Sequence, residues 1–396
     1  MVLFLHNRYR TTGGEERAVQ DLLWLVREQL GEPAQLLSRS SGELGRSRAA
    51  LGLLRGGLAP GDVERAVRLG RASVVHAHNL HPTFGWRALA AARAAGAGVV
   101  AHLHQYRLVC ATGVCFTRGA QCTRCHARNT LPGVRMNCRG SVPEALSYGV
   151  SLSLWQQRLV AQADAFIVPS AFARDRLREL GAPLPWDRVH VIAPPLPSLG
   201  RASVAQADPL DLPEDALDAL EVPFDVGGYA LVAGRLAAEK GVDVAIDACR
   251  MAGLALVVAG EGPEYEALRE RVRGAPVRFV GHVDDAQLAR LRAGAAIALA
   301  PSLSAETFGL AVAEAMAAGV PVAGSRVGAL PELLEDGALV EPGNARALAL
   351  AIGRLAGDGQ AGERGRLRVG EVCGPEPVGR ALAEVYDTVR RPQPSA

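Results

Sequence analysis

The segment at residues 304–322, SAETFGLAVAEAMAAGVPV, restricts the possible folds of this chain more than any other segment. An apolar run at 295–300 precedes it, and another apolar run at 320–323 overlaps its end. Strand, loop, helix and strand would then follow one another, which is the β-α-β unit of parallel sheets. Because ligands bind outside the carboxyl ends of such strands, the segment predicts an α/β protein with a binding loop at Glu306.

Two glutamates of this segment, Glu306 and Glu314, stand eight positions apart. Within one helix that spacing is just over two turns, so the pair would point only roughly the same way. The spacing fits better if Glu306 lies in the loop and Glu314 in the helix. The amides of Phe308, Gly309 and Leu310 would then open the helix and could hold a phosphate. Carboxylates on both sides of a phosphate would suit the binding of a nucleotide-sugar. The alternative interpretation is a surface helix with two solvated glutamates.

A second candidate site follows the apolar run at 229–233, in the sequence AGRLAAEKGVD. Arg235, next to Gly234, offers a fork of donors, and Lys240 offers a compact positive charge, which together suit a diphosphate. The alternative is a pair of ordinary loop cations. Since the Glu306 segment lies in the same half of the chain, we expect both loops to serve one ligand.

The composition fits a soluble α/β protein. Hydrophobic residues make up 49% of the 396 residues, only 5% are aromatic, and the net charge of +2 does not suggest a nucleic-acid partner. No apolar run reaches 18 residues, and residues 1–6 resemble a first strand more than a signal peptide. We therefore expect a cytoplasmic protein whose contact with the inner membrane face is at most peripheral.

Two halves of similar architecture are expected. The first comprises residues 1–200, a Pro-containing acidic linker occupies 201–227, and the second comprises 228–375. Residues 376–396 form a final helix and tail that could pack on either domain. Helices are predicted at 17–30 and 378–391, and strands at 2–6, 73–76, 98–102, 165–168, 189–192, 229–233, 254–259, 277–280, 296–299 and 320–323.

The chain resembles the family 4 retaining glycosyltransferases of the GT-B fold. The matching motifs run in order through the second half: Gly234-Arg235, Glu239-Lys240-Gly241, Gly260-Glu261-Gly262-Pro263, Phe279-Val280-Gly281 and the Glu306–Glu314 segment. The first half is similar too, in its Gly-Gly-Glu loop, its Val-His-x-His-Asn segment and a strand that ends at His104. The resemblance implies two Rossmann-like domains facing each other across a cleft, with the last helix returning to the first domain.

The resemblance also implies roles for single residues. It places the diphosphate at Arg235 and Lys240, the ribose hydroxyls at Glu314, and the transferred sugar at Glu306. The remaining implied contacts are the amides of Phe308, Gly309 and Leu310 at phosphate and sugar, Gly234 in the donor loop, Gly13 and Gly14 where backbone approaches the ligand, and His104 near the reacting centre. For His104 alone, without the resemblance, a core or helix-capping histidine would be the better interpretation.

The implied activity is that of a retaining hexosyltransferase whose catalysis needs no metal, since the two cations neutralise the departing diphosphate. The donor would be a nucleotide-diphosphate sugar. The acceptor would be a hydroxyl in polysaccharide, glycolipid or natural-product biosynthesis. One departure from the family pattern stands at 193–196, where Ala-Pro-Pro-Leu replaces a Pro-Asn-Gly-Val-Asp turn, which leaves acceptor or sugar preference open.

Five of the seven cysteines lie within 29 positions, in a loop at 110–140. Cys110, Cys122, Cys125 and Cys138 could hold a tetrahedral structural zinc, with Cys115 or His126 as substitutes. A similar cysteine-bearing insertion occurs in a subset of the family. Free thiols are the second interpretation, and disulfides are the third, because a cytoplasmic location disfavours them.

The sequence leaves three other classes of protein as alternatives. A nicotinamide oxidoreductase would need Gly-x-Gly-x-x-Gly after a strand, but the Gly260 motif continues with Pro263. A zinc-loop module for nucleic acid would need a more basic chain. A catalytically silent nucleotide-sugar-binding protein is the remaining alternative, which the presence of both glutamates and both cations disfavours.

Overall fold

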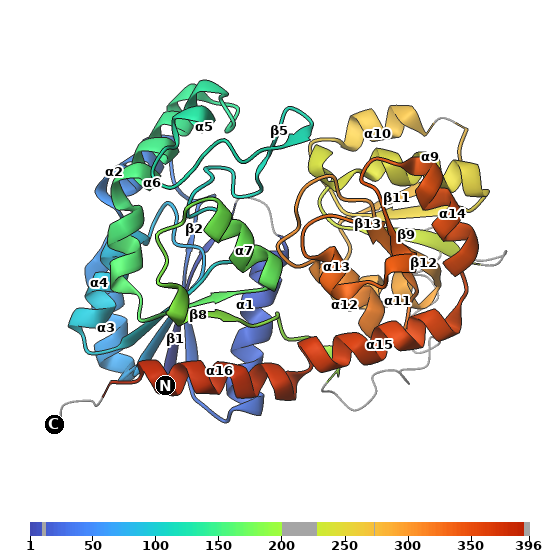
Figure 1. Ribbon diagram of the computed structural model, residues 1–396. Helices are drawn as coiled ribbons and strands as arrows, with labels where there is room; N and C mark the ends of the chain where they lie inside the picture. Colours follow the sequence, from blue (N-terminus) through green and yellow to red (C-terminus); the bar gives the residue numbers. More distant parts are fainter. Residues whose placement is uncertain (10–12, 200–227, 273, 392–396) are drawn as a thin grey trace. The chain divides into compact units, whose positions relative to one another are not determined.

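The computed structural model describes residues 1–9, 13–199, 228–272 and 274–391, and it divides into two compact units (Figure 1). The first unit contains Met1–Thr117, Gln121–Pro195 and Pro375–Ala396. The second contains Arg118–Ala120 and Leu196–Gly374. The linker expected at 201–227 lies outside the described residues.

A six-stranded parallel sheet forms the centre of the first unit, in the order β2-β1-β3-β4-β7-β8. Five of its strands coincide with predicted ones within a few residues. The exception, β2, was not predicted, although it pairs with β1 along seven residues. The strands are β1 (Val2–Arg8), β2 (Ala34–Ser40), β3 (Val74–Ala77), β4 (Gly98–His102), β7 (Ala165–Val168) and β8 (Val189–Val191).

Alternate side chains of these strands enter two separate cores, one on each face of the sheet. In β1, Leu3 and Leu5 join the core beneath α3, α4 and α7, whereas Val2 and Phe4 join the core beneath α1 and α16. Figure 1 shows helices on both faces. The helices are α1 (Gly14–Trp24, continued by a π-helical turn at Leu25–Gln29), α2 (Arg46–Arg55), α3 (Pro60–Gly70), α4 (Gly85–Ala94), α5 (Leu131–Arg135), α6 (Val142–Gln162), α7 (Ala171–Glu179) and α16 (Pro375–Val389).

The last helix, α16, packs on the first unit, which confirms the expected return of the chain. Its buried residues join the same core as Val2 and Phe4 of β1. At Gly98, an added Cβ would lie 2.0 Å from the Val389 carbonyl oxygen, so the helix passes directly over the start of β4. The residues of α16 in this core are Val378, Leu382, Val385, Tyr386 and Val389.

The second unit contains another parallel six-stranded sheet, in the order β11-β10-β9-β12-β13-β14. The chain runs outward from β9 in one direction and then, from β12, in the other, as in doubly wound folds. The reversal of strand order therefore lies between β9 and β12. The strands are β9 (Tyr229–Ala233), β10 (Leu256–Ala259), β11 (Val277–Gly281), β12 (Ala295–Ala300), β13 (Val322–Ser325) and β14 (Leu339–Val340).

Helices again cover both faces of this sheet. Ala230 and Val232 of β9 pack beneath α9 and α14, whereas Tyr229 and Leu231 pack with α11. The helices are α9 (Val242–Ala252), α10 (Tyr265–Arg271), α11 (Asp285–Ala293), α12 (Leu310–Ala317), α13 (Leu330–Leu333), α14 (Ala345–Leu355) and α15 (Gly359–Cys373). Every helix in the described parts of both units is too short or too polar to cross a lipid bilayer.

Candidate functional site

The candidate donor residues lie in two loops that follow the neighbouring strands β9 and β12. The first loop starts after Ala233 and carries Arg235 and Lys240, and the second leads from Ala300 through Glu306 to α12. The strand order reverses at this point, which is where open α/β sheets bind their ligands. The fold of the second unit thus places both predicted loops at the expected edge of the sheet.

Backbone hydrogen bonds join these loops to each other and to the loop after β10. The Leu303 amide donates to the Glu239 carbonyl oxygen at 2.8 Å, and the Leu236 amide donates to the Glu261 carbonyl oxygen at 2.8 Å. An added Cβ at Gly262 would lie 2.1 Å from the Leu236 carbonyl oxygen. Glycine is therefore required at position 262 because the two loops pack closely there. A dinucleotide-binding site is not needed to explain the Gly260–Pro263 motif.

Glu306 lies at the centre of the assembled loops. Its Oε1 accepts hydrogen bonds from Lys240 Nζ at 2.6 Å and from Ser302 Oγ at 2.6 Å. Burial alone would raise the pKa of Glu306, but Lys240, Ser302 and the charge of Arg235 outweigh burial and hold that pKa below its ordinary value. The carboxylate is therefore ionised at neutral pH.

Both candidate cations are paired with carboxylates of their own unit, which the sequence analysis did not predict. Lys240 pairs with Glu306, and the Arg235 guanidinium contacts Glu239, whose side chain is buried. An ammonium has three N–H donors and a guanidinium five, so one carboxylate partner leaves each cation able to donate to a phosphate. The pairs hold the cations in place without using all their donors.

Helix α12 opens next to Glu306. Gly309 is its N-cap with φ of 103°, a left-handed conformation that residues with a Cβ rarely adopt. The first amide bonded within the helix is that of Ala313, which donates to Gly309 at 3.0 Å. The preceding amides of the helix are not used inside it. Glu306 thus lies in the loop and Glu314 within the helix, as their spacing predicted.

Glu314 has a partner that was not among the candidates. Its Oε2 accepts from Arg292, which stands near the end of α11, and both side chains are only 9% exposed. A buried charge of this kind needs such a partner. Arg292 lies in the sequence LARLRAGAA, where nothing distinguishes it from an exposed arginine of a helix.

In the first unit, His104 follows β4 and is part of a group of buried histidines. Its Nε2 lies 2.8 Å from His78 Nδ1, and its ring stacks on His102 with centroids 4.1 Å apart. Burial, with a smaller contribution from His102, holds the pKa of His104 well below its ordinary value. His104 is therefore neutral at pH 7 and can exchange hydrogen bonds without carrying charge.

The glycine loop of the first unit also differs in detail from the expectation. Gly13 is the N-cap of α1, and its amide donates to Glu16 Oε2 at 2.9 Å. The other oxygen of Glu16 accepts from the Tyr9 amide at 3.0 Å. Gly14 is the first residue of α1, which begins three residues earlier than the predicted helix. The amide of Gly13 is thus already occupied by Glu16.

All five clustered cysteines line one small pocket of the first unit, which also includes Met136 and Leu180. The pocket is lined in part by β5 (Phe116–Thr117), which forms a short hairpin with β6 (Ala120–Gln121), and by the start of α5. His126, one of the two substitute ligands, does not line the pocket and packs instead against Gly181. The metal ligands expected from the sequence, Cys110, Cys122, Cys125 and Cys138, do meet there, together with Cys115.

Thiols are suitable ligands for zinc, but their sulfur atoms are farther apart here than in a zinc-bound site. In the described parts of the chain, no three of their sulfur atoms lie within 4.8 Å of one another. Zinc binding would draw four of them to about 3.8 Å from each other. A hydrogen bond from Cys115, opposed by burial, lowers the pKa of Cys110, whereas burial raises the pKa of Cys125 to about 11, so the thiols differ in how readily they form the thiolate that metals bind. All seven cysteines are free thiols in the structure.

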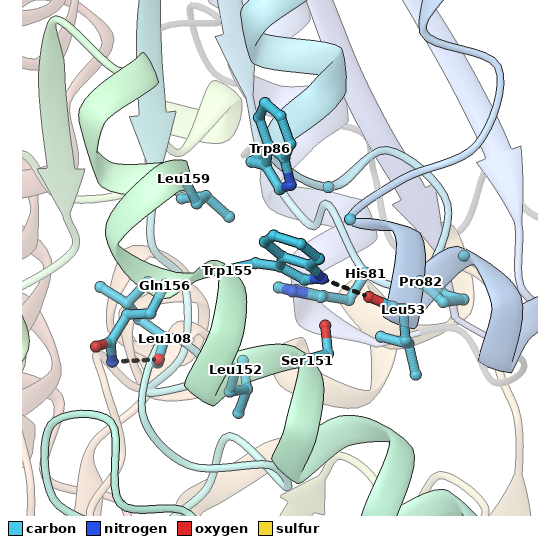
Figure 2. Close-up of a pocket in the computed structure, with 13 residues that line it drawn as sticks. Leu53, His81, Pro82, Trp86, Leu108, Ser151, Leu152, Trp155, Gln156 and Leu159 are labelled. Atoms are coloured by element: carbon cyan, nitrogen blue, oxygen red, sulfur yellow. Dashed lines mark hydrogen bonds between the residues drawn. The ribbon is translucent and has the colours of Figure 1, made fainter.

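A second pocket of the first unit lies between α2, α4 and α6 (Figure 2). Trp86 and Trp155 line it, and Figure 2 shows the Trp155 indole directed at the Leu53 carbonyl oxygen, 3.1 Å away. Gln156 donates to the Leu108 carbonyl oxygen at 2.9 Å. The free volume of this pocket, about 10 Å³, is roughly the space that one water molecule needs. The pocket is therefore a packing feature, too small for a sugar.

Comparisons with known proteins agree with this geometry. Residues 9–195 match the family model described as "Glycosyl transferase 4-like domain", and residues 228–358 match "Glycosyl transferases group 1". The first match covers every strand of the first unit's sheet except β1, and the second covers the whole sheet of the second unit. The chain is also similar to the solved structure of Anabaena Alr3699/HepE in complex with UDP-glucose, with a TM-score of 0.64 and 18% identity over 98% of this chain and 99% of that one.

Two curated relatives are similar over parts of the chain. A GDP-mannose-dependent alpha-(1-6)-phosphatidylinositol dimannoside mannosyltransferase of Mycobacterium tuberculosis is 44% identical over 107 residues, which are 26% of this chain and 28% of that protein. The glycogen synthase of M. tuberculosis is 31% identical over 282 residues, 64% of this chain and 62% of that protein. The chain thus spans less than two thirds of the length of either relative.

Proposed function

Because this chain belongs to the group 1 glycosyltransferases and has the GT-B fold, we propose that it transfers a hexose from a nucleotide-diphosphate donor to an acceptor hydroxyl. One observation carries the proposal. Two cations, a half-buried, ionised Glu306 and the opening of α12 meet at the point where the strand order of the second unit reverses. In the proposal the donor binds this unit, and the acceptor binds the first.

Lys240 and Arg235 hold the diphosphate in this proposal, assisted by the amides at the start of α12. A carboxylate has about four acceptor positions, and Lys240 and Ser302 use two of those on Glu306. Glu306 can therefore accept further hydrogen bonds from hydroxyls of the transferred sugar. The remaining assignments, Glu314 at the ribose and the neutral His104 near the anomeric carbon, follow the family resemblance.

The reaction we propose retains the anomeric configuration. The bond between the anomeric carbon and the phosphate oxygen breaks, and its electron pair leaves with the diphosphate. The acceptor oxygen forms the new bond from the same face, and its proton passes to the departing diphosphate. Fixed cations stabilise the negative charge that develops there, so catalysis needs no added divalent metal ion.

A thermal-shift screen with GDP-mannose, UDP-glucose and dTDP-glucose tests the donor assignment. The names of similar proteins include GDP-mannose and UDP-glucose, which makes these two the first candidates. One nucleotide class at 100 times its Kd is expected to stabilise the protein by about 2.7 kcal/mol. The protein should then melt several degrees higher, and a proton NMR spectrum of the product should show the retained configuration without added metal ion.

NAD is included in the screen as the ligand of the alternative, a nicotinamide oxidoreductase. Stabilisation by NAD alone would overturn the proposal. The absence of a shift with every sugar nucleotide would count equally against it. A catalytically silent binding protein would give the shift but no product in the NMR experiment.

We further propose that the five-cysteine pocket holds a structural zinc ion. The double variant Cys122→Ser/Cys125→Ser should contain about one equivalent less zinc than the wild type and should melt at a lower temperature. Cys249→Ala removes a buried thiol elsewhere and should keep the zinc content unchanged. Equal zinc in the double variant and the wild type, measured by mass spectrometry of metals, would disprove this site.

A further inference from the structure

The first unit carries a second group of potential metal ligands, distinct from the cysteines. His76 and His102 belong to the neighbouring strands β3 and β4, and His78 follows β3. All three are buried on the face of the sheet that α1 and α16 cover, next to Phe4. One ring nitrogen from each of the three lies within 4.8 Å of the other two.

We infer that His76, His78 and His102 bind a divalent transition-metal ion, with zinc as the expected metal. Imidazole nitrogens suit zinc, and sites with three histidine ligands and one open position are well known. His76 Nε2 lies 3.2 Å from His102 Nδ1. Two nitrogens bound to one tetrahedral zinc ion stand about 3.3 Å apart, so this pair is already close to the required separation.

The surroundings supply the outer partners that metal-binding histidines usually have. His76 Nδ1 lies 2.8 Å from the Tyr386 hydroxyl of α16, and His78 Nδ1 lies 2.8 Å from His104 Nε2. Each of these contacts leaves the other ring nitrogen for a metal ion. Since a hydroxyl can both donate and accept, Tyr386 can stay bonded when the proton of His76 moves to Nδ1 and Nε2 binds the ion.

A buried ring nitrogen favours an ion over a purely hydrogen-bonded cluster. The Nε2 atom of His78, which is the nitrogen that would bind the ion, has no hydrogen-bond partner among the described residues. An unsatisfied buried polar group costs about 1–3 kcal/mol, and an unobserved ion or water is a common explanation for one.

Negative charge is also present near the group. His6, whose ring lies edge-on to that of His78 at 6.4 Å, is 3.8 Å from Glu16. Burial opposes ionisation of Glu16, but the nearby His6 ring and hydrogen bonds from the backbone outweigh burial, so the pKa of Glu16 is lowered. This carboxylate would offset part of the charge of a bound cation. An ion bound by these histidines would also link β3 and β4 to α16, because His76 contacts the Tyr386 hydroxyl.

The test uses the full-length Cys122→Ser/Cys125→Ser variant, in which the cysteine pocket can no longer compete. After treatment with a chelator, zinc or cobalt(II) is added and the bound metal is counted. We expect about one equivalent, a higher melting temperature, and X-ray absorption that shows nitrogen or oxygen ligands at 2.0–2.1 Å without sulfur at about 2.3 Å. Cobalt should give no thiolate charge-transfer band.

His78→Gln and His102→Gln, made in the same background, should each weaken metal binding by at least about 100-fold, and Tyr386→Phe by about tenfold. Far-ultraviolet circular dichroism checks that each variant is folded. If the histidine variants do not fold, the X-ray absorption of the cysteine variant decides alone. Uptake below about one tenth of an equivalent, or a sulfur shell, would overturn the inference.

Discussion

Replacing Lys240 with alanine is expected to lower kcat/KM for the sugar donor by about 10²–10³-fold. The reason is that its ammonium would stabilise charge that develops on the departing diphosphate, where a fixed cation contributes more than it does in the ground state. The same substitution should abolish the thermal shift caused by the donor. Arg366→Ala, which removes a cation of an exposed pair with Glu363, is the matched control and should change neither measurement.

Lys240→Ala should also change how stability depends on pH. In the wild type the pKa of Glu306 is lowered, so its contribution to stability is present above the ordinary glutamate pKa and is lost as the pH falls through the folded value. Without Lys240, burial disfavours the carboxylate. We therefore expect urea unfolding to show a loss of about 1–3 kcal/mol at pH 7 that becomes smaller towards pH 4. A loss that is equal at both pH values would contradict the Lys240–Glu306 pairing.

The strands could be predicted wherever the sequence has a run of β-branched or other apolar residues. The runs at 98–102, 165–168 and 229–233 are strands with the predicted bounds. Strand β2 was missed because its sequence, AQLLSRS, has no β-branched residue and little alternation. It is a strand because the edge of β1 offers hydrogen bonds along its whole length, which is a property of the sheet.

Strand bounds were wrong where a residue cannot take part in the ladder. We predicted a strand from residue 320, but β13 begins at Val322. Pro321 has no N–H to donate, so the strand starts only after it. The final helix shows what a pattern alone leaves open. Its apolar stripe predicts a packing face, and the family resemblance predicted correctly that this face belongs to the first unit.

The candidate loops could be predicted from the sequence, whereas the partners of their charges could not. Lys240 and Glu306 are 66 positions apart, and Arg292 and Glu314 are 22 apart. Many pairings of cations and carboxylates are compatible with one sequence, and only the folded loops select among them. Each pair joins segments that come together only in the sheet.

The spacing of the histidines in the sequence contains information about the histidine group that our prediction did not include. The sequence HAH at 76–78 and the sequence HLH at 102–104 both have a spacing of two. Since side chains alternate along a strand, each pair points to one face. Val75 pairs with Val99 in the parallel register, so the two pairs belong to adjacent strands. The histidines could therefore have been predicted to gather on one face, although their contacts with Tyr386 could not.

The second large effect is expected at the buried pair in the second unit. Arg292→Met should lower the free energy of unfolding by about 3–5 kcal/mol, because it leaves the Glu314 carboxylate buried without its cation. Methionine keeps much of the apolar stem of arginine, so the loss reflects charge more than packing. Urea unfolding measures it. Arg366→Met, at an exposed pair, should leave the midpoint unchanged within error.

The double variant Arg292→Met/Glu314→Met separates the structural role of the pair from its proposed binding role. With both charges removed, no uncompensated carboxylate remains, and stability should recover a large part of the loss. Donor binding should not recover with it, because the proposed acceptor of the ribose hydroxyls is gone. Recovery of both stability and the donor-induced thermal shift would mean that Glu314 serves only to pair with Arg292. Recovery of neither would mean that packing around the two side chains, and not their charge, determines the stability of this region.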